Sequence, residues 1–297
     1  MKYEAMHALR YDFSVRKMAK VLNLKESAYY QWKARYERNA RRREAEAVLA
    51  KRVRQVFEEH ESVYGYRKMQ TALVNEGVEL SYYRVRKIMR ETGLYPESAK
   101  KYKPAGSKKT NDRYLENKLE QNFKASAPNE LWAGDITYIK TKPGYVYLAT
   151  VIDLYSKEII GYSISKHIDT ELTKRALANA LVTSKRREND KTIFHSDRGC
   201  QYTSKSFQKM LAASGIEGSM SRAGCPYDNA PSESLFSAMK RECIYRKDYA
   251  NIEEVKQDLF RYIELFYNRK RLHASLGYVS PQAFRQAFES RKVNQQK

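Results

Sequence analysis

The stretch TIFHSDRGCQYTS (residues 192–204) places a single carboxylate, Asp197, directly after a short apolar run. The residues from Thr192 to Phe194 predict a buried strand, and the residues from Ser204 onward have the periodicity of a helix. A buried strand that ends on an acid, in a chain dominated by basic residues, points to partners elsewhere in the sequence.

The chain of 297 residues carries 56 Lys and Arg against 35 Asp and Glu, a formal net charge of +21. This excess favours a polyanionic partner, and nucleic acid is the commonest one in the cytoplasm. A merely soluble, lysine-rich protein is the alternative. No apolar run approaches the ~18 residues of a membrane span, and the N-terminus does not resemble a signal peptide. We therefore expect a cytoplasmic protein with no membrane partner.

The three cysteines, Cys200, Cys225 and Cys243, form no CxxC pair. Their spacing predicts neither a disulfide framework nor a zinc-binding cysteine cluster. The five histidines are also too far apart for a zinc site of the usual spacing.

Residues 14–36 have the pattern of a helix-turn-helix, within an expected first segment of residues 1–44. Ser14 is placed to cap the first helix, and Asn23-Leu24 supplies the turn. The second helix would lie in a DNA major groove, and an ordinary helical hairpin with a polar face is the alternative. Its candidate DNA-binding residues are Tyr30, Lys33 and Arg35.

A second helical DNA-binding domain is expected over residues 45–95. Its last helix is predicted to be capped by Ser81 and to end at Gly93. On that helix Arg84, Arg86 and Lys87 suit phosphate contacts, although a solvated helix face explains them equally well. Residues 96–129 read as a basic linker with a short helix near residues 112–121.

From Glu130 onward the sequence becomes rich in β-branched and aromatic runs separated by turn residues. The order of three strands, helix, strand, helix, strand and helix predicts an α/β fold with a mixed five-stranded sheet. This core is expected over residues 130–245. A C-terminal helical extension with a basic tail would follow over residues 246–297.

Three acids occupy comparable places in this frame: Asp135 lies inside the first strand, Asp197 ends the fourth, and Glu233 lies one turn into a helix. An acid inside a strand is costly unless a cation compensates its charge. Converging carboxylates hold hard cations such as Mg²⁺ or Mn²⁺, and two ions about 4 Å apart serve phosphodiester chemistry. Three unrelated acids, each with a local structural role, remain the alternative from position alone.

Four stretches resemble successive signatures of DDE-type insertion-sequence transposases, which belong to the retroviral-integrase superfamily. They are WAGDITYI (132–139), FHSDRGCQYTS (194–204), SMSRAGCPYDNAPSESLFSAMKRE (219–242) and FYNRKRLHASLGYVSP (266–281). Asp135 and Asp197 are separated by 61 residues, and Asp197 and Glu233 by 35, the second interval being typical of this group. The resemblance extends over about residues 45–285.

The resemblance implies a ribonuclease H-like catalytic core preceded by all-α DNA-binding domains. The catalytic and metal-binding acids would be Asp135, Asp197 and Glu233, with Mg²⁺ or Mn²⁺ as cofactor and two ions expected. The family's basic residue seven places after the glutamate falls on Lys240, about 10 Å along the same helix face. The protein would be a transposase that cleaves and joins DNA.

The implied partners are double-stranded DNA, namely the terminal inverted repeats of the element and the target DNA. A homo-oligomer on DNA is expected, and an upstream reading frame could supply a further helix-turn-helix protein. Arg222 and Asn229, which precede the catalytic helix, are candidate DNA contacts. The cluster of Tyr267, Asn268, Arg271 and His273 resembles the family's C-terminal signature, whose role the sequence does not give.

Two further residues have competing interpretations. Asp153 could approach the active site from the second strand, but a turn cap is at least as good a reading. His195 could orient the Asp197 segment, but a core histidine with its hydrogen bonds satisfied is the better reading. The rival functions are a non-catalytic DNA-binding regulator and a ribonuclease H-like nuclease that hydrolyses DNA or RNA without joining it.

Overall fold

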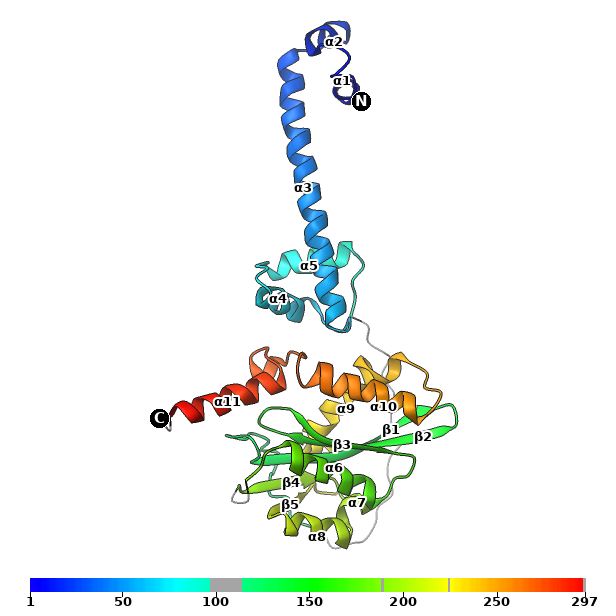
Figure 1. The fold of residues 1–297 in the computed structure, drawn as a ribbon, viewed down its shortest axis with the longest axis vertical. Helices are drawn as coiled ribbons and strands as arrows, with labels where there is room; N and C mark the ends of the chain where they lie inside the picture. Colours follow the sequence, from blue (N-terminus) through cyan, green and yellow to red (C-terminus); the bar gives the residue numbers. More distant parts are fainter. Residues whose placement is uncertain (97–113, 188–189, 224, 296–297) are drawn as a thin grey trace. The chain divides into compact units, whose positions relative to one another are not determined.

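The computed structural model describes residues 1–96, 114–187, 190–223 and 225–295. The chain divides into two compact units (Figure 1). Unit 1 contains residues 1–59 and 69–95, and unit 2 contains residues 60–68 together with the chain from residue 96 onward.

Unit 1 opens with the helices α1 (Lys2–Ala8), α2 (Val15–Val21) and α3 (Glu26–Glu59). The predicted cap of α2 is confirmed, because the Ser14 hydroxyl accepts a hydrogen bond of 3.4 Å from the Lys17 amide. The predicted turn is also present, with Asn23 at a positive φ of 51°. Met6, Ala19 and Tyr29 form the small core of these three helices.

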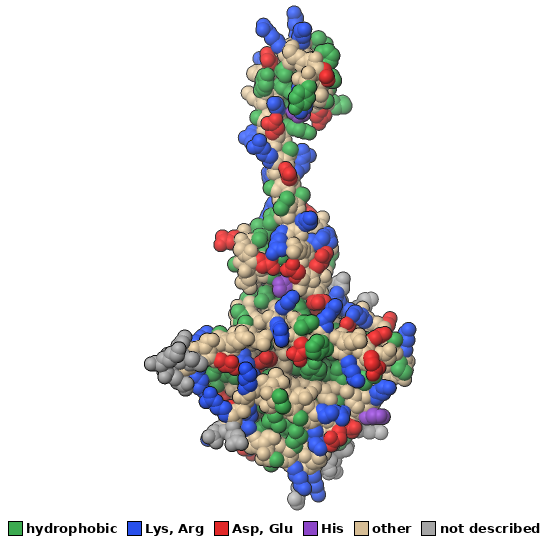
Figure 2. Space-filling view, in the orientation of Figure 1, with side chains coloured by type: hydrophobic (Ala, Val, Ile, Leu, Met, Phe, Trp, Pro, Cys, Tyr) green, Lys and Arg blue, Asp and Glu red, His purple; other side chains and the backbone are tan. Residues whose placement is uncertain are grey.

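The helix α3 is continuous over 34 residues, which corresponds to about 51 Å of helix. The expected domain boundary between residues 44 and 45 falls inside it, so the two helical segments share one helix. Residues 34–45 of α3 are exposed on every side, and many of the exposed side chains along this helix are basic (Figure 2). A helix that is polar all round needs no core contact in this stretch.

The second helical segment contains α4 (Tyr66–Asn75) and α5 (Tyr82–Glu91). The predicted cap of α5 is confirmed, since the Ser81 hydroxyl accepts a hydrogen bond of 3.3 Å from the Arg84 amide. Gly93 follows the helix at a φ of 68°, a left-handed conformation that glycine adopts without strain. Val85, Ile88 and Met89 form the buried face of α5.

Unit 2 is built on a five-stranded sheet in the order β3-β2-β1-β4-β5. Its strands are β1 (Leu131–Thr141), β2 (Gly144–Asp153), β3 (Ile159–Ser165), β4 (Thr192–Ser196) and β5 (Ile216–Met220). The first three strands pair antiparallel, and β1, β4 and β5 pair parallel. The prediction of an α/β core with a mixed five-stranded sheet is therefore confirmed.

One face of the sheet is covered by α6 (Thr170–Thr183), α7 (Cys200–Thr203) and α8 (Lys205–Ala213) (Figure 1). Trp132 and Phe194 of the sheet belong to the buried core on this side. The helix α6 approaches β3 so closely that a Cβ on Gly161 would lie 2.3 Å from the Ala176 carbonyl oxygen. Glycine is the residue that permits this packing.

The other face contacts α9 (Ala230–Glu242), which follows the short 3₁₀ helix η1 (Pro226–Asn229). After η2 (Ile244–Arg246), the helix α10 (Ile252–Phe260) continues into a π-helix, η3 (Arg261–Tyr267). The chain ends with η4 (Ala274–Leu276) and α11 (Pro281–Gln295), as expected for a helical extension. None of the helices described here is long and apolar enough to cross a membrane.

Residues 114–129, expected as part of a linker, pack against the core instead. The Lys118 amide donates to the Ser219 hydroxyl at 3.0 Å, and the Met220 amide donates to the Glu116 carbonyl at 3.3 Å. The predicted helix near residues 112–121 is wrong for residues 114–121, and residues 112 and 113 lie outside the described part. Hydrogen bonds to the edge of β5 and a turn around Asn117 take the place of helical bonds.

Candidate active site

The parallel pairing of β1 and β4 brings two of the predicted acids together. Ala133 lies opposite His195 and Gly134 lies opposite Ser196, so the next residues along the two strands are Asp135 and Asp197. Neighbouring strands are about 4.8 Å apart. A Cβ on Gly134 would lie 2.3 Å from the Phe194 ring, so glycine permits the close packing beside this pair.

Asp135 is half-buried and held by two hydrogen bonds. Its Oδ1 accepts from the Ile136 amide at 2.7 Å, and its Oδ2 accepts from Asn229 Nδ2 at 3.0 Å. Burial, followed by the negative charge of Asp197, raises the pKa of Asp135 to about 7, and the charge of Glu233 acts in the same direction. The two hydrogen bonds oppose this rise without cancelling it.

Asp197 is half-buried at the end of β4 and accepts a hydrogen bond of 3.0 Å from the Gly199 amide. Burial raises the pKa of Asp197, and the Gly199 hydrogen bond opposes that rise. The pair of acids therefore presents more negative charge than the neighbouring protein groups neutralise.

Glu233 lies in the first turn of α9 and is exposed. Pro231 occupies the start of the helix, where its missing amide hydrogen costs nothing. The helix α9 contacts β1, and the charge of Glu233 contributes to the raised pKa of Asp135. Asp135 thus interacts electrostatically with both of the other acids.

The donor set suits a hard divalent cation, because carboxylate oxygens are its preferred ligands and its charge would relieve the repulsion around Asp135. Within the described ranges, no group of three or more His, Cys, Asp and Glu side chains is arranged to hold one ion. Asp135 is the acid whose pKa both other carboxylates influence.

Asn229, a candidate DNA contact, lies against Asp135. Its side chain is 8% exposed and donates to the Asp135 carboxylate. Its Oδ1 and the hydroxyl of Ser232 are buried without a hydrogen-bond partner among the described residues.

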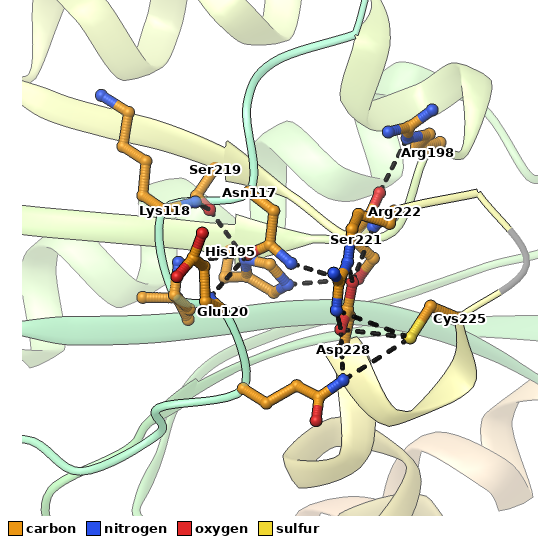
Figure 3. A network of polar contacts seen from close by, with 12 residues as sticks. Asn117, Lys118, Glu120, His195, Arg198, Ser219, Ser221, Arg222, Cys225 and Asp228 are labelled. Atoms are coloured by element: carbon orange, nitrogen blue, oxygen red, sulfur yellow. Dashed lines mark hydrogen bonds and ion pairs between the residues drawn. The ribbon is translucent and has the colours of Figure 1, made fainter.

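Arg222, also a candidate DNA contact, is engaged by Asp228, as Figure 3 shows. Its Nε and Nη2 donate to the two Asp228 oxygens at 3.0 and 3.2 Å, and its amide donates at 2.9 Å. Asn117, Gln121 and Cys225 donate to the same carboxylate. The Arg222 hydrogen bond is the main reason that the pKa of Asp228 lies well below its usual range.

Lys240 is half-buried on α9, with Nζ 5.1 Å from the centre of the Tyr138 ring. Burial lowers the pKa of Lys240, and the charge of Asp135 opposes that change. The ammonium group therefore lies close enough to sense the acidic site, as the shared helix face predicted. Tyr138, which contacts it, was not singled out from the sequence.

The interpretations of His195 and Asp153 as structural residues are confirmed. His195 is buried between the hydroxyls of Ser219 and Ser221, at 2.9 and 3.1 Å. Asp153 is fully buried and accepts from the amides of Asn129 and Ser156 at 2.7 and 2.8 Å. Its Oδ1 thus stabilises the turn after β2, and its Oδ2 holds the segment before β1.

The C-terminal cluster holds the last residue of α9. Arg271 donates to both oxygens of Glu242, at 2.7 and 2.6 Å, and Tyr262 donates to Glu242 at 2.8 Å. Burial alone would raise the pKa of Glu242, but the contacts with Arg271 prevail and lower it. The pairing of Glu242 with Arg271 joins positions 29 residues apart, and no sequence spacing predicts it.

Asn268, from the same cluster, bridges to β3 by donating to the Ile159 carbonyl and accepting from the Ile159 amide, each at 3.0 Å. Tyr267 packs edge-on against His273, with ring centres 5.1 Å apart. The whole cluster therefore joins the C-terminal segment to the sheet and to α9.

The candidate DNA-binding residues of unit 1 have different surroundings. Tyr30 is 51% exposed and Arg35 is exposed, while Lys33 lies 3.7 Å from Glu37. On α5, Arg84 pairs with Glu46 at 3.0 Å and Lys87 with Glu91 at 3.8 Å, whereas Arg86 is exposed. Tyr30, Arg35 and Arg86 are the best presented to a ligand.

Comparison with protein families gives three matches. Residues 125–226 match a family described as "Integrase core domain", and residues 214–281 match a second family with the same description. Residues 43–102 match an "HTH-like domain".

Two curated relatives are similar over most of the chain. The transposase InsF for insertion sequence IS3A of Escherichia coli (strain K12) is 37% identical over 284 residues, 96% of this chain and 98% of the relative. The transposase for insertion sequence element IS904 of Lactococcus lactis subsp. lactis (strain IL1403) is 40% identical over 238 residues, 80% and 93% respectively. Among solved structures, the HTLV-2 integrase catalytic core domain in complex with magnesium (trimeric form) aligns at 16% identity with a TM-score of 0.42. The alignment covers 55% of this chain and 99% of the HTLV-2 chain.

Proposed function

Because the chain belongs to the family of insertion-sequence transposases that includes InsF of IS3, we propose that Asp135, Asp197 and Glu233 are its catalytic carboxylates. A transposase of this family, with an integrase core and an HTH-like domain, is a polynucleotidyl transferase with a ribonuclease H-like core. The reaction is cleavage at the ends of the element, followed by joining of the freed 3′-hydroxyl to another phosphodiester.

The observation that carries this assignment is the parallel pairing of β1 with β4, which sets Asp135 beside Asp197. Burial and the charges of Asp197 and Glu233 raise the pKa of Asp135 to about 7, in agreement with it. Uncompensated acids of this kind are costly to stability and typical of sites that bind a cation. Asp135 and Asp197 would hold one Mg²⁺ or Mn²⁺, and Asp135 and Glu233 a second. Two such ions, when bound, activate the attacking oxygen and stabilise the leaving oxygen.

The protein's own residues orient the site and the DNA. Asn229 holds the Asp135 carboxylate through its 3.0 Å hydrogen bond. Lys240, half-buried near Asp135, supplies a positive charge that attracts a phosphate of the DNA, since an ammonium group donates hydrogen bonds and accepts none. In-line geometry and neutralisation of charge are what phosphoryl transfer needs most.

The proposed DNA partners are the terminal inverted repeats of the element and the target DNA. Exposed residues of unit 1, Tyr30, Arg35 and Arg86, are the candidates for these contacts. Since an element has two ends, we expect a homo-oligomer to act on them, and an upstream-frame helix-turn-helix protein could contribute as well. The reaction would take place in the bacterial cytoplasm, where the chromosome lies.

Substitution of Asp135 by Asn tests the assignment. A carboxamide lacks the charge that holds a hard dication, so the variant is expected to lose Mg²⁺- or Mn²⁺-dependent cleavage by more than a hundredfold while it retains DNA binding. Binding of Mn²⁺ to the wild-type protein is expected to strengthen as the pH rises through about 7, because Asp135 must lose its proton.

The exposed Asp248 provides a matched control, since Asp248→Asn makes the same chemical change outside the site. Cleavage by the wild-type protein in excess chelator would contradict the proposal, as would full activity of the Asp135→Asn variant. A joining assay on pre-cleaved ends separates a transposase from a nuclease, which would hydrolyse without joining. Loss of cleavage in Asp135→Asn with DNA binding intact also excludes a purely regulatory protein.

A further inference from the structure

Residues 60–68 lie in sequence between α3 and the main part of α4, yet they belong to unit 2. Tyr64 is the fully buried centre of this segment. Its hydroxyl donates to the Lys270 carbonyl at 3.1 Å and accepts from the Leu272 amide at 2.7 Å. A single hydroxyl thus satisfies the backbone on both sides of Arg271.

The same segment is fixed at further points. The Tyr64 ring stacks on His60 at 4.5 Å, and Lys68 Nζ lies 5.1 Å from its centre. The carbonyl of Glu61 accepts from Arg246 at 2.8 Å, and its carboxylate pairs with Arg261 at 3.2 Å. These contacts reach η2 and η3, the elements that follow α9 in the chain and precede Arg271.

Arg271, the residue that Tyr64 brackets, is 9% exposed and holds both oxygens of Glu242. Glu242 ends α9, and Glu233 lies in the first turn of the same helix. The nine-residue step from Glu233 to Glu242 corresponds to about 13.5 Å of helix. Because a helix is rigid over this length, a change in position at Glu242 also displaces Glu233.

We propose that Tyr64 is a positioning residue for the active site: it fixes the backbone of residues 270–272 so that Arg271 holds Glu242, and through α9 sets the position of Glu233. The inference rests on the proposed catalytic role of Glu233. The segment of residues 60–68 accordingly helps to position the active site, in addition to connecting α3 with α4.

The charges around Arg271 agree with a compact, ordered cluster. Burial, together with the charge of Arg271, lowers the pKa of Lys68 to about 8 and that of His273 to about 3. A residue of the segment and a residue of the C-terminal signature therefore respond to the same guanidinium group. This places residues 60–68 in direct electrostatic contact with the Arg271–Glu242 pair.

The test is Tyr64→Phe in the full chain, which keeps the ring and removes only the hydroxyl. Strand joining is measured on pre-cleaved element ends, with kcat and the KM for DNA determined separately. We expect kcat to fall about tenfold, because two buried backbone groups lose their partner, while KM stays unchanged. Tyr95→Phe is the matched control, since Tyr95 is 65% exposed, and it should keep the wild-type kcat.

A second variant, Glu61→Gln, removes the ion pair with Arg261 without touching the core of the segment. It should lower kcat in the same direction by a smaller factor, and it decides the matter if Tyr64→Phe fails to fold. A wild-type kcat in a folded Tyr64→Phe or Glu61→Gln variant would overturn the inference, as would a loss confined to KM. If the wild-type protein itself does not join DNA, the proposed function fails instead.

Discussion

At the scale of a single residue, the position of Lys240 determines which interactions its positive charge makes. A lysine on an exposed helix face typically contributes about 0.3–0.5 kcal/mol through a pair with a neighbouring acid. Here the ammonium group is half-buried, lies over the Tyr138 ring and senses the charge of Asp135. Burial of a charge beside an acidic site is better explained by a role toward DNA than by helix stability.

Replacement of Lys240 by Ala should therefore reduce strand joining by about 10- to 100-fold, the value of a lost charged hydrogen bond. Lys240→Arg should retain more activity, because the charge is kept although its geometry differs. The measurement is strand transfer on pre-cleaved element ends, with binding of Mn²⁺ followed in parallel and expected to be unaffected. Lys205→Ala, an exposed lysine on α8, is the control. A wild-type joining rate for Lys240→Ala would remove the residue from the active site.

At the scale of the element, α9 is anchored at both ends. Asp228 gathers donors from Arg222, Asn117 and Gln121 just before the helix, as Figure 3 shows. Glu242 is held by Arg271 where the helix ends. Glu233 is exposed in the first turn of this helix, so its position follows from these two anchors.

Substitution of Asp228 by Asn should destabilise the protein by about 1 kcal/mol at neutral pH, because an amide accepts on one oxygen only and the lost ion pair joins Asp228 to a half-exposed Arg222. Arg222 lowers the pKa of Asp228 in the folded protein. The carboxylate therefore contributes its full stabilisation above pH 3.8, the ordinary pKa of an aspartate, and this stabilisation is lost as the pH falls further. The difference in the free energy of unfolding between the Asp228→Asn variant and the wild-type protein should accordingly shrink below about pH 4.

Unfolding in urea, followed at pH 7 and at pH 3, measures this difference. Asp248→Asn, which alters an exposed carboxylate, should be neutral at both values. A constant difference between the Asp228→Asn variant and wild type at the two pH values would show that the buried carboxylate is not the origin of the effect.

At the scale of the whole molecule, the two units divide the chain differently from the domains that the sequence indicated. Residues 60–68 belong to unit 2 although α3 and most of α4 belong to unit 1. A fragment that ends at residue 95 would expose the apolar ring of Tyr64, so DNA binding is better measured on the full chain.

Binding of the full chain to duplex DNA is expected without metal and should weaken steeply with salt, by a log–log slope of about −0.9 for each phosphate neutralised. Tyr30→Ala or Arg35→Ala should weaken binding to the element's ends more than binding to random DNA, since base contacts specify and phosphate contacts do not. Titrations with both DNAs at several salt concentrations give the salt slope and the affinity for each DNA. Equal losses on both would mean that these residues contact phosphates alone.

Local signals in the sequence determined most of the secondary structure. β-branched and aromatic runs predicted the strands of the sheet, and Ser14 and Ser81 cap helices where their spacing predicted. The break expected between residues 44 and 45 did not occur, because α3 has good helix-forming residues throughout and no glycine or proline stops it. Local propensity is carried by neighbouring residues, so it can be read along the chain.

The pairing of distant residues was decided only by the tertiary structure. The acids Asp135 and Asp197 were predicted from the resemblance of the motifs around them, and the parallel pairing of β1 with β4 brings them together. By contrast, the contacts of Asn229 with Asp135 and of Arg222 with Asp228 were not predicted from the sequence. The bonds of Tyr64 with residues 270 and 272 have no trace in sequence spacing. A hydrogen bond needs its partners within about 3 Å, and which side chains meet at that distance depends on how sheet, helices and loops pack together.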